Sequence, residues 1–142
     1  MTNPISDIEG ADFILAIGTN TTETHPIVGL KVKKAVRRGA TLVVVDPRET
    51  EVARLAHRHL RLRPGTDIAL LNALAHVIIE EGLYDREFVE SRTEGFEDLK
   101  EVVARYTPEY AAEITGIEAG IIREVARGYA QAPNATILYT MG

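Results

Sequence analysis

The stretch that decides the fold is residues 13–26, which read FILAIGTNTTETHP. Its first five residues are apolar and do not alternate with polar ones, a pattern typical of a strand buried on both faces of a parallel sheet. Gly18 ends this run, and a polar loop then leads into residues 27–38, whose apolar positions predict an amphipathic helix. Ligands of open α/β sheets bind beyond the carboxyl ends of the strands, so this loop is the first candidate binding site.

Three further segments have the character of strands. Residues 41–45, TLVVV, predict a second buried strand, and a strand, a helix and a strand in succession predict a right-handed unit with parallel strands. The alternating residues 57–62 predict an edge strand, and residues 135–139, ATILY, predict a fourth buried strand. We therefore expect one α/β domain over residues 1–142, with a Rossmann-like open parallel sheet of about four strands flanked by helices.

The second half of the chain is predicted to be rich in helices. Residues 68–81 are apolar on most faces, so we expect this helix to be enclosed in the core. Thr107 before Pro108 is typical of a helix start, and Thr115 with Glu118 predicts a capping box for the last helix. The helices predicted after residue 81 are 85–91, 95–105, 108–113 and 117–131.

Composition narrows the class of protein. The chain has 142 residues, 45% hydrophobic and 26% charged, which is typical of a folded globular domain. Its net charge of -5 argues against a nucleic-acid partner. It has no apolar run of membrane-spanning length and no signal peptide, so we expect no membrane insertion and a cytoplasmic location. It has no Cys, which excludes iron–sulfur ligation and a thiol nucleophile within these residues, and its four His lack the spacing of a zinc site.

Polar clusters follow three of the predicted strands, and a parallel sheet brings such strand ends to one edge. The Thr and Asn side chains of the first loop suit a diphosphate. Asp46 suits ribose hydroxyls, Arg48 suits a base or a phosphate, and the Asp67 carboxylate can accept two hydrogen bonds from guanine. The pattern predicts a nucleotide site. The candidate residues are Gly18, Asn20, Thr22, Glu23 and His25 in the first loop, Asp46 and Arg48 in the second, and Gly65 and Asp67 in the third.

Each candidate also has a purely structural interpretation. Asp46 with Pro47 can end a strand, Thr66 or Asp67 can cap a helix, and Glu23 can be an ordinary first-turn carboxylate. His25 lies in the loop and is a candidate ligand contact. The other three His, at 57, 59 and 76, are predicted to have structural roles. The glycine motifs of nicotinamide and ATP sites are absent, which disfavours those two ligands.

The order of three motifs resembles a known family. Residues 20–26 contain N-x-x-E-x-H-P, residues 46–48 are D-P-R, and residues 64–67 are P-G-T-D. In this order they are similar to the molybdopterin-dependent oxidoreductases, and most similar to the catalytic alpha subunit of formate dehydrogenase. The later residues SRTEGFEDLKEVVARYTPEYAAEITGI and LYTMG are similar to the same subunit, so the resemblance covers nearly the whole chain.

The resemblance implies a cofactor and a larger protein. The cofactor is molybdenum or tungsten held by two molybdopterin guanine dinucleotides, with Asn20, Glu23, Asp46, Arg48, Gly65 and Asp67 contacting one of them and Met141 and Gly142 beginning a further cofactor loop. The parent subunit would oxidise formate to carbon dioxide and pass electrons through an iron–sulfur cluster that lies outside this piece. Its partners would be the remaining domains of the subunit and iron–sulfur electron-transfer subunits or domains.

The same resemblance implies what this piece cannot do alone. The family's metal is ligated by a Cys or selenocysteine, and neither is present here, so we expect the chain to be an internal piece without a catalytic residue or metal ligand and inactive by itself. Two alternatives stay open at this point. The parent could be a nitrate reductase of the same family, or the chain could be a non-catalytic interaction module that keeps the fold, as in the large subunit of respiratory complex I.

Overall fold

The computed structural model describes residues 3–140, which form two compact units. The sheet unit comprises the described residues up to 61 together with 132–140, and the helical unit comprises residues 62–131.

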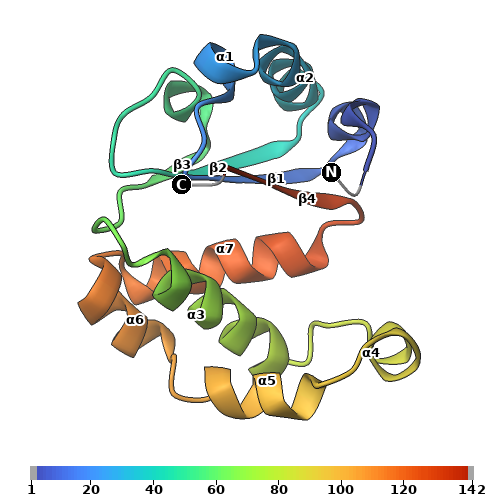
Figure 1. The fold of residues 1–142 in the computed structure, drawn as a ribbon, viewed down its shortest axis with the longest axis vertical. Helices are drawn as coiled ribbons and strands as arrows, with labels where there is room; N and C mark the ends of the chain where they lie inside the picture. Colours follow the sequence, from blue (N-terminus) through green and yellow to red (C-terminus); the bar gives the residue numbers. More distant parts are fainter. Residues whose placement is uncertain (1–2, 141–142) are drawn as a thin grey trace. The chain divides into compact units, whose positions relative to one another are not determined.

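The sheet unit is built on four parallel strands. Strand β1 (Phe13–Ile17) pairs in parallel with β2 (Thr41–Val45) on one side and with β4 (Ala135–Tyr139) on the other, and β3 (Arg58–Leu60) pairs with β2. The strand order is β3-β2-β1-β4, as Figure 1 shows. The mixed α/β class with an all-parallel sheet is confirmed, and so is the edge position of the third strand.

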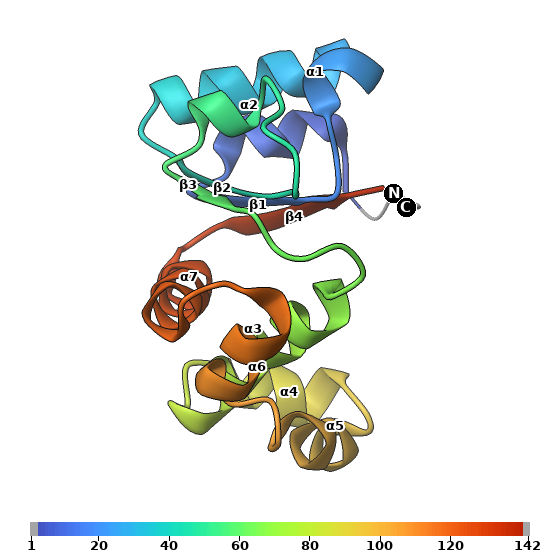
Figure 2. The ribbon, with the colours of Figure 1, turned by 90° about the vertical axis from the view of Figure 1, so that its left-hand side faces the viewer.

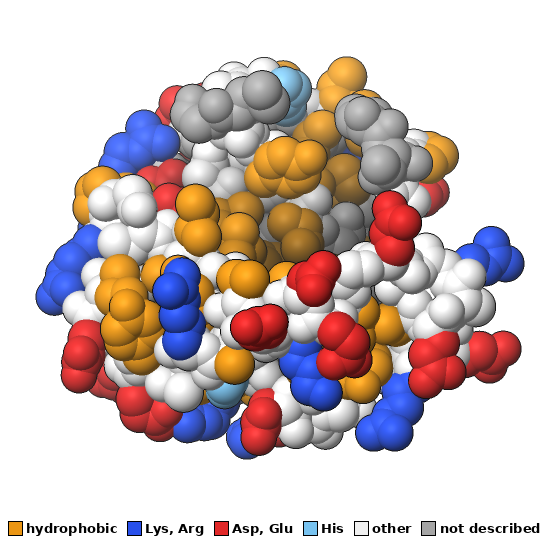
Figure 3. All heavy atoms as spheres, turned by 60° about the horizontal axis from the view of Figure 1, so that its bottom comes forward, with side chains coloured by type: hydrophobic (Ala, Val, Ile, Leu, Met, Phe, Trp, Pro, Cys, Tyr) orange, Lys and Arg blue, Asp and Glu red, His pale blue; other side chains and the backbone are white. Residues whose placement is uncertain are grey.

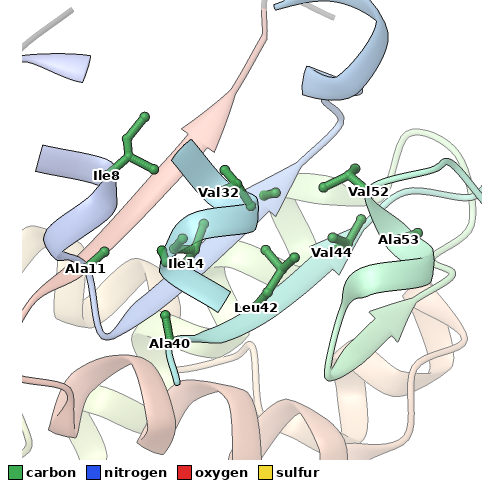
Figure 4. Packing of buried hydrophobic residues seen from close by; sticks show 11 residues of the cluster. Ile8, Ala11, Ile14, Val32, Ala40, Leu42, Val44, Val52 and Ala53 are labelled. Carbon is green, nitrogen blue, oxygen red and sulfur yellow. The ribbon is translucent and has the colours of Figure 1, made fainter. Parts of the chain in front are cut away.

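One face of this sheet is covered by helices that follow or precede its strands. The 3-10 helix η1 (Ile5–Gly10) and the α-helices α1 (Thr21–Thr24) and α2 (Pro26–Arg37) lie together on that face (Figure 2). A second 3-10 helix, η2 (Ala53–Leu55), follows β2. Side chains from these elements and from alternate positions of β1 and β2 form one apolar cluster, shown in Figure 4. Its buried members are Ile8, Ala11, Ile14, Ala16, Val32, Ala35, Ala40, Leu42, Val44, Val52 and Ala53.

One expectation for the sheet unit is wrong. Strand β4 is not buried along its length as predicted: Ile137 is 40% exposed and Tyr139 is 73% exposed. The run of five uncharged residues predicted a buried strand, yet β4 lies at the edge of the order β3-β2-β1-β4. The sequence carried no prediction of η1 or of α1, because turns this short leave no helical periodicity to detect.

The helical unit is organised around its longest helix. Helix α3 (Asp67–Glu80) packs against α5 (Phe96–Val103), α6 (Pro108–Thr115) and α7 (Ala119–Gln131), while α4 (Arg86–Arg92) has no buried residue. Arg127 on α7 donates to both carboxylate oxygens of Glu81, which follows α3, at 2.8 Å from Nε and 2.7 Å from Nη2. This arginine lowers the pKa of Glu81, chiefly through these hydrogen bonds. Figure 3 shows acidic and basic side chains over the lower part and the margins of the face that it draws.

Three expectations for these helices meet different outcomes. The Thr107 hydroxyl accepts a hydrogen bond from the Tyr110 amide at 3.2 Å, which confirms the predicted helix start. The capping box is wrong: Thr115 ends α6, and its hydroxyl donates to the Ala111 carbonyl at 2.8 Å instead of capping α7. The enclosure of α3 is also wrong in part, because Ile68 is 71% exposed. Among the described residues, no helix is long and apolar enough to span a membrane.

The apolar cluster of the sheet unit should dominate its stability. Ile14 is fully buried, whereas Ile137 is 40% exposed. Ile14→Ala should lower the free energy of unfolding by about 2–5 kcal/mol, because it removes buried methyl groups and leaves a cavity. Ile137→Ala, the same change on the neighbouring strand, should cost less than half as much. Urea denaturation followed by circular dichroism measures both, and equal losses would contradict this account of the core.

Candidate functional site

Gly18 forms the junction between β1 and the candidate loop. Its φ of +57° is left-handed, a conformation that residues with a side chain rarely adopt. Its amide donates to the Val45 carbonyl at the end of β2 at 2.9 Å, and its own carbonyl accepts from the Thr140 hydroxyl, just past β4, at 2.7 Å. Hydrogen bonds from both neighbouring strands therefore fix the direction in which the loop leaves the sheet.

Three buried oxygen atoms in this loop lack a partner. They are the side-chain oxygens of Asn20 (Oδ1), Thr21 (Oγ1) and Thr22 (Oγ1), and no hydrogen-bond partner for them exists in the part of the chain that the structure describes. A buried polar group left unpaired costs about 1–3 kcal/mol, so native proteins rarely keep one without a reason. Three in consecutive residues at the carboxyl end of a central strand make this segment the candidate for contact with polar groups of a ligand.

The close packing of α1 on α2 holds these residues in place. A Cβ on Gly29 of α2 would lie 3.2 Å from the Thr21 carbonyl oxygen and 3.2 Å from the Thr22 Cα, closer than side chains normally approach a backbone. Thr24 adds local hydrogen bonds: its hydroxyl donates to the Asn20 carbonyl at 2.9 Å and lies 2.9 Å from His25 Nδ1. Gly29 thus allows the short helix that carries the unpaired oxygens to sit directly against α2.

At the end of β2, Asp46 and Arg48 form a pair. The Asp46 carboxylate is buried and accepts from the Arg48 amide at 2.8 Å and from Arg48 Nε at 3.2 Å. The Arg48 side chain is 73% exposed and covers this carboxylate from the solvent side. The hydrogen bond and charge of Asp46 raise the pKa of Arg48, and the charge of Glu23 adds to this effect. Asp46 directly follows the last residue of β2, as its structural interpretation predicted. Its carboxylate also orders the turn by accepting from the Arg48 amide.

His59 supports the same turn from the neighbouring strand. Its Nε2 lies 2.9 Å from the Asp46 carbonyl oxygen, and because a carbonyl can only accept, the imidazole is the donor. The amide of Leu42 donates to His57 Nδ1 at 3.1 Å, and His76 Nδ1 lies 3.0 Å from the Val103 carbonyl oxygen. All three of these His bond to backbone groups, in agreement with the structural roles predicted for them.

The third polar cluster belongs to the helical unit. Gly65 has a φ of +80° and forms the turn before α3, and Asp67 is the first residue of that helix. Thr66 precedes the helix without capping it, since its hydroxyl donates to the Arg63 carbonyl at 2.6 Å. Arg63 Nη1 in turn donates to the Glu113 carbonyl at 2.6 Å near the end of α6.

The structure brings some of the predicted site residues together and leaves others apart. Within the sheet unit, the loop after β1 and the turn after β2 lie at the carboxyl ends of paired strands, and their predicted residues are Gly18, Asn20, Thr22, Glu23, His25, Asp46 and Arg48. Gly65 and Asp67 lie in the other unit, and Met141 and Gly142 lie outside the described residues. A single site formed by all of these residues stays a prediction.

Sequence reasoning missed three residues of this region. Thr21 carries one of the unpaired oxygens, Thr140 bonds to Gly18, and His59 bonds to the Asp46 backbone. The position of Thr140 directly after a strand was a usable signal, whereas nothing in the sequence distinguishes the Thr21 hydroxyl from its neighbours. In the described residues 3–140, no group of three His, Asp or Glu side chains is placed to hold a metal ion.

This arrangement defines a class. A parallel α/β sheet with unpaired polar side chains beyond its central strand is typical of ligand-binding α/β proteins. The sequence model of the molybdopterin oxidoreductase family matches residues 1–142. The chain belongs to this family.

Known proteins of the family are similar along the whole chain. Formate dehydrogenase H of Escherichia coli is 51% identical over 142 residues, which are 100% of this chain and 20% of that protein. The F420-dependent formate dehydrogenase subunit alpha of Methanocaldococcus jannaschii is 49% identical over 142 residues, 100% of this chain and 21% of that protein. The structure of acetylene hydratase from Pelobacter acetylenicus superposes with a TM-score of 0.84 at 40% identity, over 96% of this chain and 20% of that one. The chain thus spans about a fifth of the length of these relatives.

The close contact between α1 and α2 at Gly29 can be tested by substitution. Gly29→Ala should lower the free energy of unfolding by about 1–3 kcal/mol, because the new methyl group must push away the backbone of Thr21 and Thr22. Gly120→Ala on α7 is the matched control: nothing lies within 4 Å of its Cβ position, so alanine should stabilise the chain by about 0.5–1 kcal/mol.

Thermal or urea unfolding of the two glycine variants gives both free energies, and amide NMR shifts locate the change. Shifts in Gly29→Ala should concentrate in residues 19–25. Stabilisation by both substitutions would show that α1 is not held against α2.

Proposed function

We propose that this chain is the part of a formate dehydrogenase catalytic subunit that anchors one molybdopterin guanine dinucleotide. The observation that carries the proposal is the set of three buried, unpaired oxygens of Asn20, Thr21 and Thr22 beyond the central strand. Hydroxyl groups donate to phosphate oxygens, and the amide of Asn20 offers both donor and acceptor atoms. A ligand with a diphosphate and hydroxyl groups satisfies all three, so the residues fit this cofactor.

The pair at the end of β2 suits the neighbouring part of such a ligand. Asp46 is a buried carboxylate at the end of the second strand, where doubly wound nucleotide sites commonly place an acid for ribose hydroxyls. The exposed guanidinium of Arg48 can turn from Asp46 toward a phosphate or stack on a base. Glu23 and His25, exposed on the same loop as Asn20, complete the proposed contacts of the sheet unit.

The guanine would be held by residues of the helical unit. Asp67, half-buried in the first turn of α3, has the two acceptor oxygens that guanine N1–H and its exocyclic amine require. The left-handed turn at Gly65 lets the backbone approach a flat ring without a side chain in between. Met141 and Gly142 are proposed as the start of a further cofactor loop.

The reaction of the complete protein follows from its relatives. Two relatives near 50% identity are named as formate dehydrogenases, so we assign formate oxidation to carbon dioxide, with transfer of electrons, to the parent subunit. When bound, the cofactor with its molybdenum or tungsten ion supplies the redox chemistry. We propose that this chain's own residues bind and orient the dinucleotide. The chain has no Cys to ligate the metal or a cluster, so we expect it to be inactive alone.

The fold by itself does not determine that reaction. A protein named acetylene hydratase shares it at 40% identity, so related chains serve enzymes with different chemistry. The choice of formate rests on sequence similarity, whereas the proposed role in holding a dinucleotide rests on this chain's own loops. We propose that the iron–sulfur cluster lies in the remaining four-fifths of such a protein and that its electron-transfer partners are iron–sulfur subunits or domains.

Nucleotide titration tests the proposal directly. By calorimetry, GDP should bind more tightly than ADP, because only guanine presents two donors to Asp67. Asp67→Ala should weaken GDP binding about tenfold and leave ADP binding unchanged, since it removes hydrogen bonds to a charged group. Asp98→Ala, another first-turn aspartate of the helical unit, is the matched control and should alter neither affinity.

A second variant tests the proposed contacts of the sheet-unit loops with the nucleotide. Asn20→Ala should weaken binding of GDP and ADP equally, about five- to tenfold, because the ribose hydroxyls that can donate to its Oδ1 and the diphosphate that can accept from its amide nitrogen are common to both. Amide NMR shifts on adding GDP should map to residues 18–25, 46–48 and 63–67. Equal binding of the two nucleotides, or shifts confined to other residues, would contradict the proposed anchoring role and favour a non-catalytic interaction module.

A further inference from the structure

We propose that Thr140 is a positioning residue that holds the dinucleotide-binding loop after β1 through Gly18. This inference rests on the proposed function for its consequence on binding, but the positioning itself is a property of the chain without ligand. The carrying observation is the 2.7 Å hydrogen bond that the Thr140 hydroxyl donates to the Gly18 carbonyl.

This hydrogen bond lies where the strand order of the sheet predicts a ligand-binding site. Strand order β3-β2-β1-β4 reverses direction at β1, since β2 lies on one side of it and β4 on the other. Ligands of open α/β sheets bind beyond the carboxyl ends of the strands at such a reversal point. Gly18 directly follows β1, and Thr140 directly follows β4. The hydroxyl therefore joins the residues that directly follow β1 and β4, at the point where a ligand is expected.

Gly18 is where the direction of the loop is set. A left-handed φ of +57° turns the chain away from the strand, and the next peptide leads to Thr19 and then to the three unpaired oxygens. The Gly18 amide is fixed by the Val45 carbonyl at 2.9 Å. Thr140 fixes the other side of the residue, so the orientation of both peptide groups that flank Gly18 is determined by strands β2 and β4.

Stability alone does not explain this hydroxyl. Thr140 is an exposed residue, and an exposed carbonyl such as that of Gly18 can be hydrated by water at little cost. What water cannot do is hold the carbonyl in one direction relative to β4. The hydroxyl thus restricts the loop more than it stabilises the fold, as expected of a residue that prepares a binding site.

The test compares three variants, two at Thr140 and one within β4, without ligand. Thr140→Val removes the hydroxyl and keeps the shape, Thr140→Ser keeps the hydroxyl, and Thr136→Val is the matched control within the strand. Hydrogen exchange of the Glu23 and Thr24 amides, which both donate to the Asn20 carbonyl, reports on the order of the loop. Exchange should be about fivefold faster in Thr140→Val and unchanged in the other two variants.

The same variants are then titrated with GDP. Thr140→Val should weaken GDP binding about three- to tenfold, Thr140→Ser should restore it to within about twofold, and Thr136→Val should bind like the original chain. The melting temperatures of Thr140→Val and Thr136→Val should agree closely, which separates positioning from global stability.

The outcomes distinguish this inference from the proposed function. Unchanged loop exchange in Thr140→Val overturns the positioning role, whatever the nucleotide result. Faster exchange in the Thr140→Val loop, combined with a chain that binds no GDP, supports the positioning role and contradicts the proposed function. Equal loss of binding in Thr140→Val and Thr136→Val would mean that the effect is not specific to the hydroxyl that bonds to Gly18, and this also overturns the inference.

Discussion

The parallel pairing of β1 with β2 and β4 is the constraint on which the rest of the sheet unit depends. On each side of β1, five consecutive residues pair with five residues of the neighbouring strand, so the three strands end level with one another. Parallel strands share a direction, so all their following loops emerge at one edge. The two hydrogen bonds of Gly18, to Val45 and from Thr140, exist only because that register places the three strand ends side by side. Polar side chains distant in sequence become neighbours for the same reason.

The strands and most helices could be predicted because burial leaves a pattern in the sequence. Strands β1, β2 and β4 have the bounds that their uncharged runs predicted, since charged residues are excluded from such strands, and Gly18, Asp46 and Thr140 follow the three runs. Edge position was harder to predict. Both the enclosed β1 and the part-exposed β4 lack charged residues, and composition does not record which neighbours a strand has. The Thr115 error has a similar origin: a hydroxyl suited to start one helix instead bonds within the helix that it ends.

In the candidate site, too, some features could be predicted from the sequence and others could not. The types and positions of its residues follow from the rule that loops after parallel strands bind ligands, which is why Asn20, Asp46 and Arg48 could be named in advance. The internal bonds could not. Asp46 holds Arg48 and receives support from His59 across a strand, and these are contacts between segments that no local pattern encodes. The same holds for Thr140, whose partner lies 122 residues earlier in the chain.

The unpaired oxygens bear on whether this chain keeps a working site or only the fold. An interaction module that had lost its ligand would gain stability by replacing Thr21 with a valine or an alanine, because each buried unpaired hydroxyl costs about 1–3 kcal/mol. Total stability of a small domain is about 5–15 kcal/mol, so three such groups are a substantial burden. Since Asn20, Thr21 and Thr22 lie together beyond the central strand rather than scattered over the unit, their cost supports the proposal that one ligand satisfies all three.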